Sequence, residues 1–358
     1  MRILVVTGTN DRSEIALYRG LAQAGIALQI ACEPDESNTR ELVTANIPVR
    51  PLHIRHKLDI GAVRKLRRWL VNEGFDGFYA VSGKALAVSM LASSGLKMFR
   101  VAYRGTCGHV KRWNPVSWLT YLNPRIDCII CVSEAVRKYL QMQGVSSEKL
   151  VTIYKGHDIA WYERQQKPSL SEFGIPAEAF VVCFAGTVRP VKGVDVLLKA
   201  IASLSASENI HCLVIGKIRD RKVKKLARKI NGRVHFTGFR TDAPLLIGAS
   251  HVLIMPSLAR EGLPRAIIEA MSQRVPVIGT NVGGIPEIVT DGQCGIIVPP
   301  GDSESIAKAI LFLKQNPELR RQMGNNSQQK VIHNFNIEST IKNTVSLFLQ
   351  LHSKYEKP

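Results

Sequence analysis

The chain has 358 residues, too many for one ordinary hydrophobic core, so we expect two domains. A hydrophobic content of 45% is typical of a globular protein and excludes a disordered or fibrous chain. The net charge of +19 favours phosphates, polyanions or anionic lipid as partners. Alternatively, the charge only keeps the protein soluble.

The first eight residues, MRILVVTG, contain an apolar run too short for a signal peptide, and we expect a first strand there. No later run approaches the length of a membrane span. The seven cysteines have no paired spacing, which is typical of reduced core residues in a cytoplasmic protein. Cys128 and Cys131 form a C-x-x-C within the apolar run 127–132, but that run predicts a buried strand, so we expect neither metal nor redox chemistry there.

Strands and helices alternate along the first half of the chain. The pattern predicts strands at 2–7, 26–32, 77–81, 99–103 and 127–132, and helices at 13–24, 60–72 and 134–143. It restarts at Val181 with short apolar runs and with helices expected at 193–206, 220–230, 264–273 and 303–315. This alternation predicts two doubly wound α/β domains in series, joined in the polar stretch 158–176.

Residues 217–233 carry nine cations and one acid. The segment has almost no aromatic residues to stack on bases, and Val223, Leu226 and Ile230 recur at helical spacing. A solvated basic helix is therefore favoured over a nucleic-acid contact.

The stretch AREGLPRAIIEAMS, residues 259–272, places Glu261 and Glu269 eight positions apart. Pro264 suits the first turn of a helix, so we expect a helix to begin there, with Glu261 in the preceding loop and Glu269 inside the helix. The free N–H groups at a helix start suit an anion, and the two carboxylates could accept hydrogen bonds from sugar or ribose hydroxyls. Alternatively, one glutamate favours the helix dipole and the other is solvated.

Ligands of open α/β sheets collect beyond the carboxyl ends of the strands. Four such loops of the second half carry notable residues: Arg189 and Lys192, Phe239 and Arg240, Glu261, and the pair Gly283 and Gly284. Each loop alone has an ordinary structural explanation, and Lys192 could be a solvated charge. Their shared position at one sheet edge predicts a ligand site.

The segments FAGTVRPVKGVDVLLKAI, FTGF and MPSLAREGLPRAIIEAMSQRVPVIGTNVGGIPEIVTDGQCGIIVPPGD resemble the GT-B-fold retaining glycosyltransferases of family 4, the glycosyl transferases group 1. The specific motif is E-x7-E followed by a GG-x-PE loop. The resemblance implies two doubly wound Rossmann-like domains that face each other across a cleft. It assigns residues 1–160 with 336–358 to an acceptor-side domain and 161–335 to a nucleotide-sugar-binding domain.

The resemblance also implies roles for individual residues. Glu261 would contact the hydroxyls of the donor sugar, Glu269 the ribose, and Lys192 the diphosphate, with the base near Gly238, Phe239 and Arg240. The remaining donor-side residues are Gly186, Gly262, Leu263, Pro264 and Gly284. The acceptor side resembles the family only loosely; it would comprise Gly8, Thr9 and Asn10, and Ser13 equally fits a helix cap.

The expected reaction retains the anomeric configuration and needs no cofactor and no metal. The chain has no D-x-D motif to hold a metal ion, and fixed cations would stabilise the leaving diphosphate instead.

Two positions depart from the family pattern. The arginine usually five residues before the lysine is replaced by Thr187, and Arg189 stands three residues before Lys192, which leaves its role open. The histidine of an x-x-H-G motif is replaced by Arg104, and the nearest histidine is His109. Either residue is a candidate for the donor sugar, although a lone histidine is more often structural.

The leading interpretation is a transferase that moves a hexose from a nucleoside-diphosphate sugar to a saccharide or lipid-linked saccharide, in cell-envelope polysaccharide or lipopolysaccharide synthesis. Alternatives are a polyanion- or nucleic-acid-binding protein on the same fold, a sugar-nucleotide epimerase, or a phosphorylase, for which no pyridoxal-phosphate lysine motif is present. The base, the sugar and the acceptor are not specified by the sequence.

Residues 57–74 predict an amphipathic helix. Its apolar arc comprises Leu58, Ala62, Val63, Leu66, Trp69 and Leu70, and the opposite arc comprises Lys57, Arg64, Lys65, Arg67 and Arg68. A helix packed on a sheet has this pattern, and we favour that over insertion in a membrane. Because the cations face outward in both cases, we expect a cytoplasmic protein with salt-sensitive, peripheral attachment to the anionic inner face of the membrane.

Overall fold

The computed structural model describes residues 1–8, 10–33, 36–163, 165–230 and 232–356. The chain forms two compact units, Met1–Gly156 with Ile337–Pro358, and His157–Asn336. The expected boundaries at 160/161 and 335/336 lie close to these. The chain passes from the first unit to the second after Gly156, just before the polar stretch 158–176 in which we expected this boundary.

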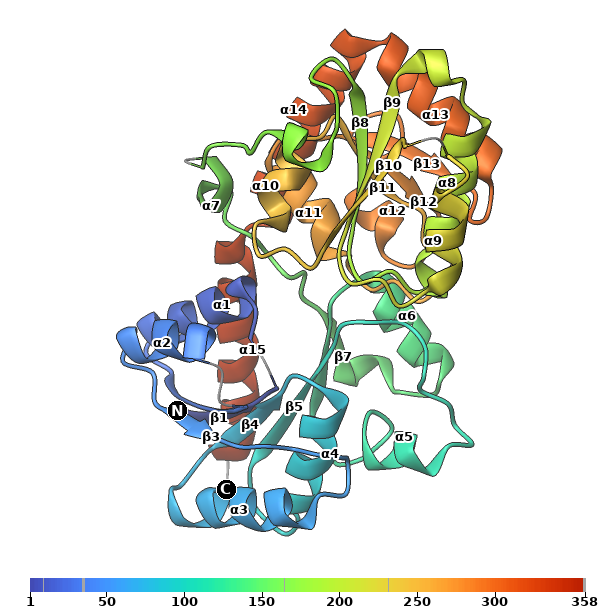
Figure 1. Ribbon diagram of the computed structural model, residues 1–358. Coiled ribbons are helices and arrows are strands. Elements are labelled where there is room, and N and C mark those ends of the chain that lie inside the picture. The colour runs from blue at the N-terminus through green and yellow to red at the C-terminus, as the bar shows by residue number, and fades with distance from the viewer. Residues whose placement is uncertain (9, 34–35, 164, 231, 357–358) are drawn as a thin grey trace. The chain divides into compact units, whose positions relative to one another are not determined.

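The first unit is built on a seven-stranded sheet in the order β3-β2-β1-β4-β5-β6-β7, and every neighbouring pair is parallel. Its strands are β1 (Arg2–Val6), β2 (Ala27–Cys32), β3 (Val49–Pro51), β4 (Gly77–Ala80), β5 (Phe99–Arg104), β6 (Cys128–Cys131) and β7 (Leu150–Thr152). Its helices are α1 (Arg12–Gln23), α2 (Glu36–Thr44), α3 (Ile60–Asn72), α4 (Gly83–Ala92), α5 (Pro115–Leu119), α6 (Glu134–Met142) and α15 (Ile337–Glu356). Figure 1 shows α1, α2 and α15 grouped on one side of this sheet. Helices α3 and α4 pack against each other.

The second unit is built on a six-stranded parallel sheet in the order β10-β9-β8-β11-β12-β13. Its strands are β8 (Phe180–Ala185), β9 (Ile210–Ile215), β10 (Val234–Gly238), β11 (Val252–Met255), β12 (Val277–Thr280) and β13 (Gly295–Val298). Its helices are α7 (Ala160–Glu163), α8 (Val194–Ser203), α9 (Arg221–Ala227), α10 (Ala243–Gly248), α11 (Arg265–Ser272), α12 (Ile285–Ile288), α13 (Ser303–Gln315) and α14 (Pro317–Asn334). Helices α8, α9 and α13 lie on one side of the sheet, and α10, α11 and α14 on the other (Figure 1).

The two parallel sheets with helices on both faces confirm the predicted α/β class. The crossover to β4, which returns the chain to the other side of β1, brings together the carboxyl ends of β1 and β4 at the point where ligands bind in such sheets. The loops after the strands therefore hold the candidate site residues of both units.

Two expectations about helix starts need correction. Helix α1 is capped by Asp11, whose carboxylate accepts a hydrogen bond from the Glu14 backbone N–H at 3.0 Å, while Glu14 accepts one from the Asp11 N–H. Ser13 therefore lies inside the helix and is not its cap, because the Asp-x-x-Glu capping box is the stronger signal. Pro264 is itself the N-cap, with extended backbone, and α11 begins one residue later at Arg265.

Helix α3 spans the predicted residues 60–72 and packs by one face. Ala62, Leu66 and Leu70 are buried, whereas Arg64 and Arg68 are exposed. Leu58 is 59% exposed, contrary to its expected place on the apolar arc, because Asp59 caps the helix and Leu58 lies before it. The helix is thus a packed element with a cationic outer face, as favoured from the sequence.

The basic segment 217–233 also packs by its apolar positions. Val223 and Ile230 are buried, and Lys222, Lys224 and Lys225 around them are exposed. Helix α9 is therefore a solvated basic helix in the described part of this segment.

Cys128 and Cys131 lie in β6 and are both buried, as predicted. Burial raises the pKa of each thiol to about 12, so both remain protonated at neutral pH. Cys107 differs from the expected core position because it lies half-buried in the loop after β5.

The C-terminal helix α15 completes the core of the first unit. Phe348 is fully buried, and its ring centroid lies 5.8 Å from that of Tyr79 and 6.2 Å from that of Phe99. Helix α15 packs closely on α1 at Gly20, where a Cβ would lie 2.2 Å from Ile341 Cδ1 and would displace that side chain. The first domain is therefore closed by residues from the far end of the sequence.

Truncation of Phe348 tests this closure. Phe348→Ala should destabilise the protein by about 3–5 kcal/mol, because it removes a large aromatic side chain from a packed core. Leu349→Ala, at a neighbouring position that is 55% exposed, is the matched control and should have little effect. Urea unfolding followed by circular dichroism measures both. Equal stability of the two variants would contradict the assignment of α15 to the first core.

Candidate donor and acceptor sites

The loops after β8, β11 and β12 meet backbone to backbone at the carboxyl edge of the second sheet. Gly193 has φ +64°, and a Cβ there would lie 2.0 Å from the Pro256 carbonyl oxygen. Gly283 has φ +56°, and a Cβ there would lie 2.0 Å from the Glu261 carbonyl oxygen. Glycine is required at both positions by the left-handed backbone and by the close contact. The close approach at Gly283 is thus made to the Glu261 loop, and Gly284 adopts an ordinary φ of −83° as the N-cap of α12.

Lys192 and Glu261 form a largely buried ion pair at this edge. The Lys192 Nζ lies 2.6 Å from Glu261 Oε1, and Ser257 Oγ donates to the same oxygen at 2.5 Å. The two side chains are only 17% and 7% exposed, so Lys192 is not a solvated loop charge. Thr280 Oγ1 donates to the Ser257 carbonyl oxygen at 2.7 Å, which links this pair to the end of β12. An ammonium group has three donors, and this contact uses one.

Glu269 occupies a different environment, inside α11, as predicted. It is 8% exposed, and its Oε1 lies 3.1 Å from Arg265 Nε, one helical turn earlier. Gln273 donates to the Glu269 carbonyl oxygen at 3.0 Å and to the Pro244 carbonyl oxygen at 2.6 Å. The helix is thereby fastened to α10, which fixes the backbone that carries Glu269. The E-x7-E motif therefore positions two buried carboxylates, one in the loop and one in the helix.

The loop between these glutamates is itself well packed. Gly262 and Pro264 are buried and Leu263 is half-buried. The amino end of α11 follows directly, and no side chain caps it. This segment can thus present backbone donors beside Glu261.

The loop after β10 exposes an aromatic ring. Phe239 is 67% exposed, and Lys217 Nζ lies 5.3 Å from its ring centroid. Arg240 is committed to Asp242 through two hydrogen bonds of 2.8 and 2.7 Å, and these bonds lower the pKa of Asp242 against the opposing effect of burial. Gly238, with φ +71°, makes the turn. The ring of Phe239 can offer a flat face to a planar ligand, whereas Arg240 mainly holds the loop.

Arg189 and Gly186 lie in the loop after β8. Arg189 is exposed and extended, directly before the short 3₁₀ turn η3 (Pro190–Lys192). Gly186 has φ +145°, and its carbonyl oxygen lies 2.1 Å from the position of a Cβ on Gly216. Lys192 is therefore held inward by the turn, while Arg189 stands outside it.

In the first unit, Arg104 is folded back onto its own loop. Its Nε donates to the Thr106 carbonyl oxygen at 2.8 Å, and a second nitrogen donates to the Gly108 carbonyl oxygen. Its guanidinium lies 4.6 Å from the Tyr121 ring centroid. His109, next in this loop, is exposed and adopts φ +64°. Arg104 thus stabilises the loop after β5 through hydrogen bonds to its backbone, and His109 lies exposed on that same loop.

The loop after β1 contains Gly8 and Asn10, and Asn10 is 6% exposed. Thr9 lies outside the described residues. Nothing lies within 4 Å of a Cβ placed on Gly8, so no close backbone contact requires glycine there. This loop leads directly into the capping box of α1.

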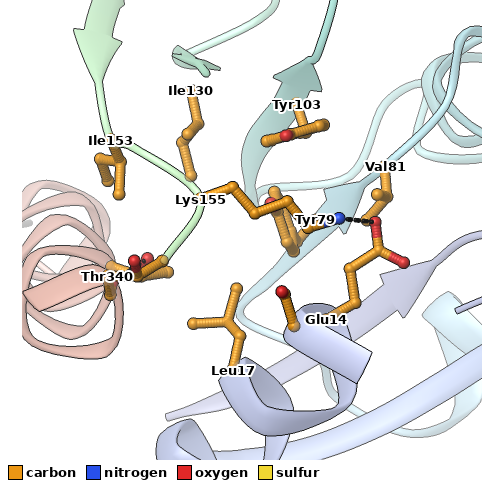
Figure 2. A pocket seen from close by; sticks show the side chains of 11 residues that line it. Glu14, Leu17, Tyr79, Val81, Tyr103, Ile130, Ile153, Lys155 and Thr340 are labelled. Atoms are coloured by element: carbon orange, nitrogen blue, oxygen red, sulfur yellow. Dashed lines mark hydrogen bonds and ion pairs between the residues drawn. The ribbon is translucent and has the colours of Figure 1, made fainter. Parts of the chain in front are cut away.

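An ion cluster that sequence reasoning missed fastens this loop to the end of the sheet. Lys155, after β7, contacts Asp11 Oδ2 at 2.5 Å and Glu14 Oε1 at 3.0 Å, and Figure 2 shows its amine directed at Glu14. Burial raises the pKa of Glu14, and the charge of Lys155 only partly opposes this. Burial lowers the pKa of Lys155, but Glu14 and Asp11 outweigh it and the pKa is raised. The partners are 144 and 141 residues apart, so only the strand order could have paired them.

A small cavity of about 20 Å³, large enough for one water molecule, lies beside this cluster. Tyr79 and Tyr103 line it together with Lys155 and Glu14 (Figure 2). Burial raises the pKa of both tyrosines well above the usual value, so they remain neutral. The cluster is a fixed structural support for the β1–α1 loop.

Comparison with known families identifies the family to which both units are similar. Residues 165–330 match the family described as glycosyl transferases group 1, and residues 12–161 match glycosyltransferase family 4. The chain belongs to these glycosyltransferases. The resemblance inferred from the E-x7-E and GG-x-PE motifs is thereby confirmed, and it extends over both units.

Individual family 4 relatives are similar over part of their length. A phosphatidyl-myo-inositol mannosyltransferase of Mycolicibacterium smegmatis is 27% identical over 264 residues, covering 72% of this chain and 67% of that protein. A lipopolysaccharide core biosynthesis glycosyltransferase of Rhizobium meliloti is 27% identical over 217 residues, covering 60% and 61%. Two further relatives align over 59% of their own length.

Solved glycosyltransferase structures share the fold. An Anabaena protein, HepE, crystallised with UDP, superposes with a TM-score of 0.81 at 24% identity, covering 98% of this chain and 100% of that one. The fold is therefore GT-B, with two Rossmann-like domains, as predicted. Within the described residues no helix is long and apolar enough to cross a bilayer.

Substitution of Gly283 tests the packing that holds the Glu261 loop. Gly283→Ala should cost well above the roughly 1–2 kcal/mol of a left-handed alanine, because its Cβ would also collide with the Glu261 carbonyl. Gly292→Ala is the matched control, since Gly292 has φ +70° and nothing within 4 Å of its Cβ position. Thermal unfolding of both variants measures the difference. If the two variants lose the same stability, the Gly283–Glu261 contact is not a constraint.

Proposed function

We propose that the protein transfers a hexose from a nucleoside-diphosphate sugar to a saccharide or lipid-linked saccharide, with retention of the anomeric configuration. The observation that carries the proposal is the largely buried Lys192–Glu261 pair, whose glutamate lies in the loop before the helix that carries the second carboxylate of the E-x7-E motif. The Anabaena neighbour was crystallised with UDP, which supports a nucleotide-sugar donor. The mannosyltransferase named for phosphatidyl-myo-inositol supports a lipid-linked acceptor.

Donor binding would use both glutamates. Glu269, held by α11, would accept hydrogen bonds from the two ribose hydroxyls, and Glu261 would accept them from the sugar. Phe239 would stack on the base, next to Gly238 and Arg240. The exposure of Phe239 and the commitment of Arg240 to Asp242 support stacking over ionic recognition of the base.

Lys192 would stabilise the diphosphate as it leaves. Glu261, which also accepts a hydrogen bond from Ser257, holds the Lys192 side chain in place before any donor arrives, so little reorganisation is needed when negative charge develops. A departing phosphate oxygen would take the proton of the acceptor hydroxyl, which then attacks from the same face and retains the configuration. In this mechanism fixed cations take the place of a metal ion, and no cofactor takes part.

Arg189 and His109 would contribute secondary contacts. Arg189 lies outside the η3 turn and is exposed, so it can reach a phosphate only from the rim. The Arg104 guanidinium already donates hydrogen bonds to carbonyl oxygens of its own loop. This favours His109 over Arg104 as the first-domain side chain that contacts substrate. Gly8 and Asn10 would belong to the acceptor side, supported from below by Lys155.

The cellular setting we propose is cell-envelope polysaccharide or lipopolysaccharide synthesis, in the cytoplasm, with the protein attached to the membrane surface. The lipopolysaccharide core relative supports the pathway. The outward cations of α3 support attachment, although Lys65 and Arg67 also donate to backbone carbonyls of the protein itself. Product analysis with a panel of UDP-, GDP- and ADP-sugars tests the reaction, and a new sugar nucleotide in place of a glycoside would identify an epimerase.

The ribose contact predicts the effect of Glu269→Ala. Nucleotide affinity should fall by about 1.5–3 kcal/mol per charge-assisted hydrogen bond lost. Loss of the ion pair with Arg265 should cost only about 0.3–0.5 kcal/mol of stability. Titration calorimetry with UDP, GDP and ADP measures the affinity, and Glu304→Ala, at an exposed site in α13, serves as control. Unchanged affinity in Glu269→Ala would refute the assignment.

Lys192→Ala should lower kcat by about 10²-fold or more as well as raise KM, because the charge matters most as the diphosphate leaves. Lys192→Arg keeps the charge and should retain more activity, and Lys308→Ala, at an exposed lysine of α13, should resemble the unmodified protein. Activity should persist in EDTA. A change in KM alone would reduce Lys192 to a binding residue, and strict metal dependence would overturn the metal-free mechanism.

A further inference from the structure

An exposed aromatic surface lies at α5 and the end of α6. It consists of Trp113, Val116, Trp118 and Met142, which are 77%, 41%, 52% and 71% exposed. Three of these lie within six residues of each other in the sequence. Water-exposed tryptophans so close together are typical of an interaction site. We call these four side chains, with Lys111, Arg112 and Lys149, the α5 surface.

The α5 surface rests on an anchored framework. Tyr139 Oη donates to the Val110 carbonyl oxygen at 2.6 Å, and the Val110 N–H donates back to it at 3.0 Å. Arg112 Nε donates to the Gln143 carbonyl oxygen at 2.9 Å, which joins the loop to the end of α6. Trp118 Nε1 donates to the Arg112 carbonyl oxygen at 2.7 Å. The tryptophans are therefore exposed to solvent on a loop whose backbone is held by hydrogen bonds.

The charged residues of the α5 surface are all cations, although the exposed Glu148 directly precedes Lys149. Between Gly105 and Ile126 the sequence contains Lys111, Arg112 and Arg125 and no acidic residue. Lys111 Nζ lies 5.1 Å from the Trp113 ring centroid, so cation and ring share one face. A second copy of this chain, with net charge +19, would bring like charges together there. An anionic partner is complementary to this surface.

A groove of about 480 Å³ adjoins Trp118. Most of its lining is apolar and includes Tyr121, Leu122, Ile126 and Val145, while Arg112 and Lys149 stand at its polar side. Lys149 also donates to the Pro124 carbonyl oxygen at 2.7 Å, which fixes its amine there. An apolar cavity with cations beside it suits an amphiphile with an anionic head group and an acyl chain.

We propose that the α5 surface docks the protein on a bilayer that contains anionic lipid. Trp113 and Trp118 lie in the interfacial layer, where amphipathic rings are most stable, and Arg112 and Lys149 bind lipid phosphates. This deepens the proposed membrane attachment by naming its surface. Helix α3 differs because its core-facing residues are buried and its exposed apolar residues, Ile60 and Val71, are aliphatic, so it adds mainly salt-sensitive attraction through its cations.

The test is vesicle cosedimentation of the full chain without donor or acceptor. Phosphatidylcholine vesicles with phosphatidylglycerol should bind the protein, and phosphatidylcholine alone should bind it weakly. Trp113→Ala and Trp118→Ala should each weaken binding by about tenfold, the effect of withdrawing one large apolar side chain from burial. Phe312→Ala, an exposed aromatic of the second unit at 45%, is the matched control and should bind like the unmodified protein.

Trp113→Ala is preferred as the main variant because it removes a side chain that is 77% exposed and cannot compromise the core. The proposal is overturned if the unmodified protein does not bind anionic vesicles, if the tryptophan variants bind equally well, or if only Arg64→Ala/Arg68→Ala in α3 abolishes binding. It is also overturned if Trp113→Ala changes the oligomeric state in solution, which would identify the surface as a contact between copies. UDP affinity measured in parallel reports on the proposed transferase reaction independently of this surface.

Discussion

The carboxyl edge of the second sheet depends on one interaction, the ion pair between Lys192 and Glu261. Taking both charges out of water is expensive, and the contact at 2.6 Å together with the hydrogen bond from Ser257 to the carboxylate offsets that cost. The pair joins the loop after β8 to the loop after β11, and glycine at 193 and 283 lets the surrounding backbones approach. Removing either charge would leave the other buried without its partner. The arrangement is therefore held ready in the absence of ligand, which is the condition for electrostatic stabilisation without reorganisation.

The first unit repeats this solution with different residues. Lys155 joins the loop after β7 to the capping box of α1, again with a largely buried cation between two loops at the carboxyl edge of a parallel sheet. The loops that follow parallel strands lie side by side, but they have no regular backbone hydrogen bonds to each other, so side chains must connect them. In both units the lysine follows a strand and the carboxylates stand at or just before a helix start. The consequence is a stiff edge on each unit, built from groups that could otherwise face solvent.

Strand and helix periodicity predicted the class, the two domains and several helices, and α3 and α13 have the predicted bounds, but the two longest helices, α14 and α15, were not predicted from periodicity. Helix α4 was not predicted because it is apolar on nearly every side, and a buried helix has no amphipathic period to detect. The donor motif was recognisable because Glu261, Glu269 and the glycine loop lie close together in sequence. The Lys155 cluster was not recognisable from the sequence, because Lys155 and its partners Asp11 and Glu14 are far apart in the chain and only the order of the strands in the sheet brings them together. The true cap of α1 was readable, because Asp11 and Glu14 have capping-box spacing and Ser13 does not.

The high net charge takes two distinct forms in the folded chain. Lys192 and Lys155 are enclosed and paired with carboxylates, so they do not contribute to a long-range field. The cations of α3, of α9 and of the α5 surface lie outside, where salt screens them and each contributes little alone. Charge of this second kind attracts a broad anionic surface but does not define an orientation on it. Exposed rings that are held rigidly can supply that orientation, because apolar contact is short-ranged and is not screened by salt. In this chain the two occur together at α5, where Trp113 and Trp118 stand beside Lys111 and Arg112.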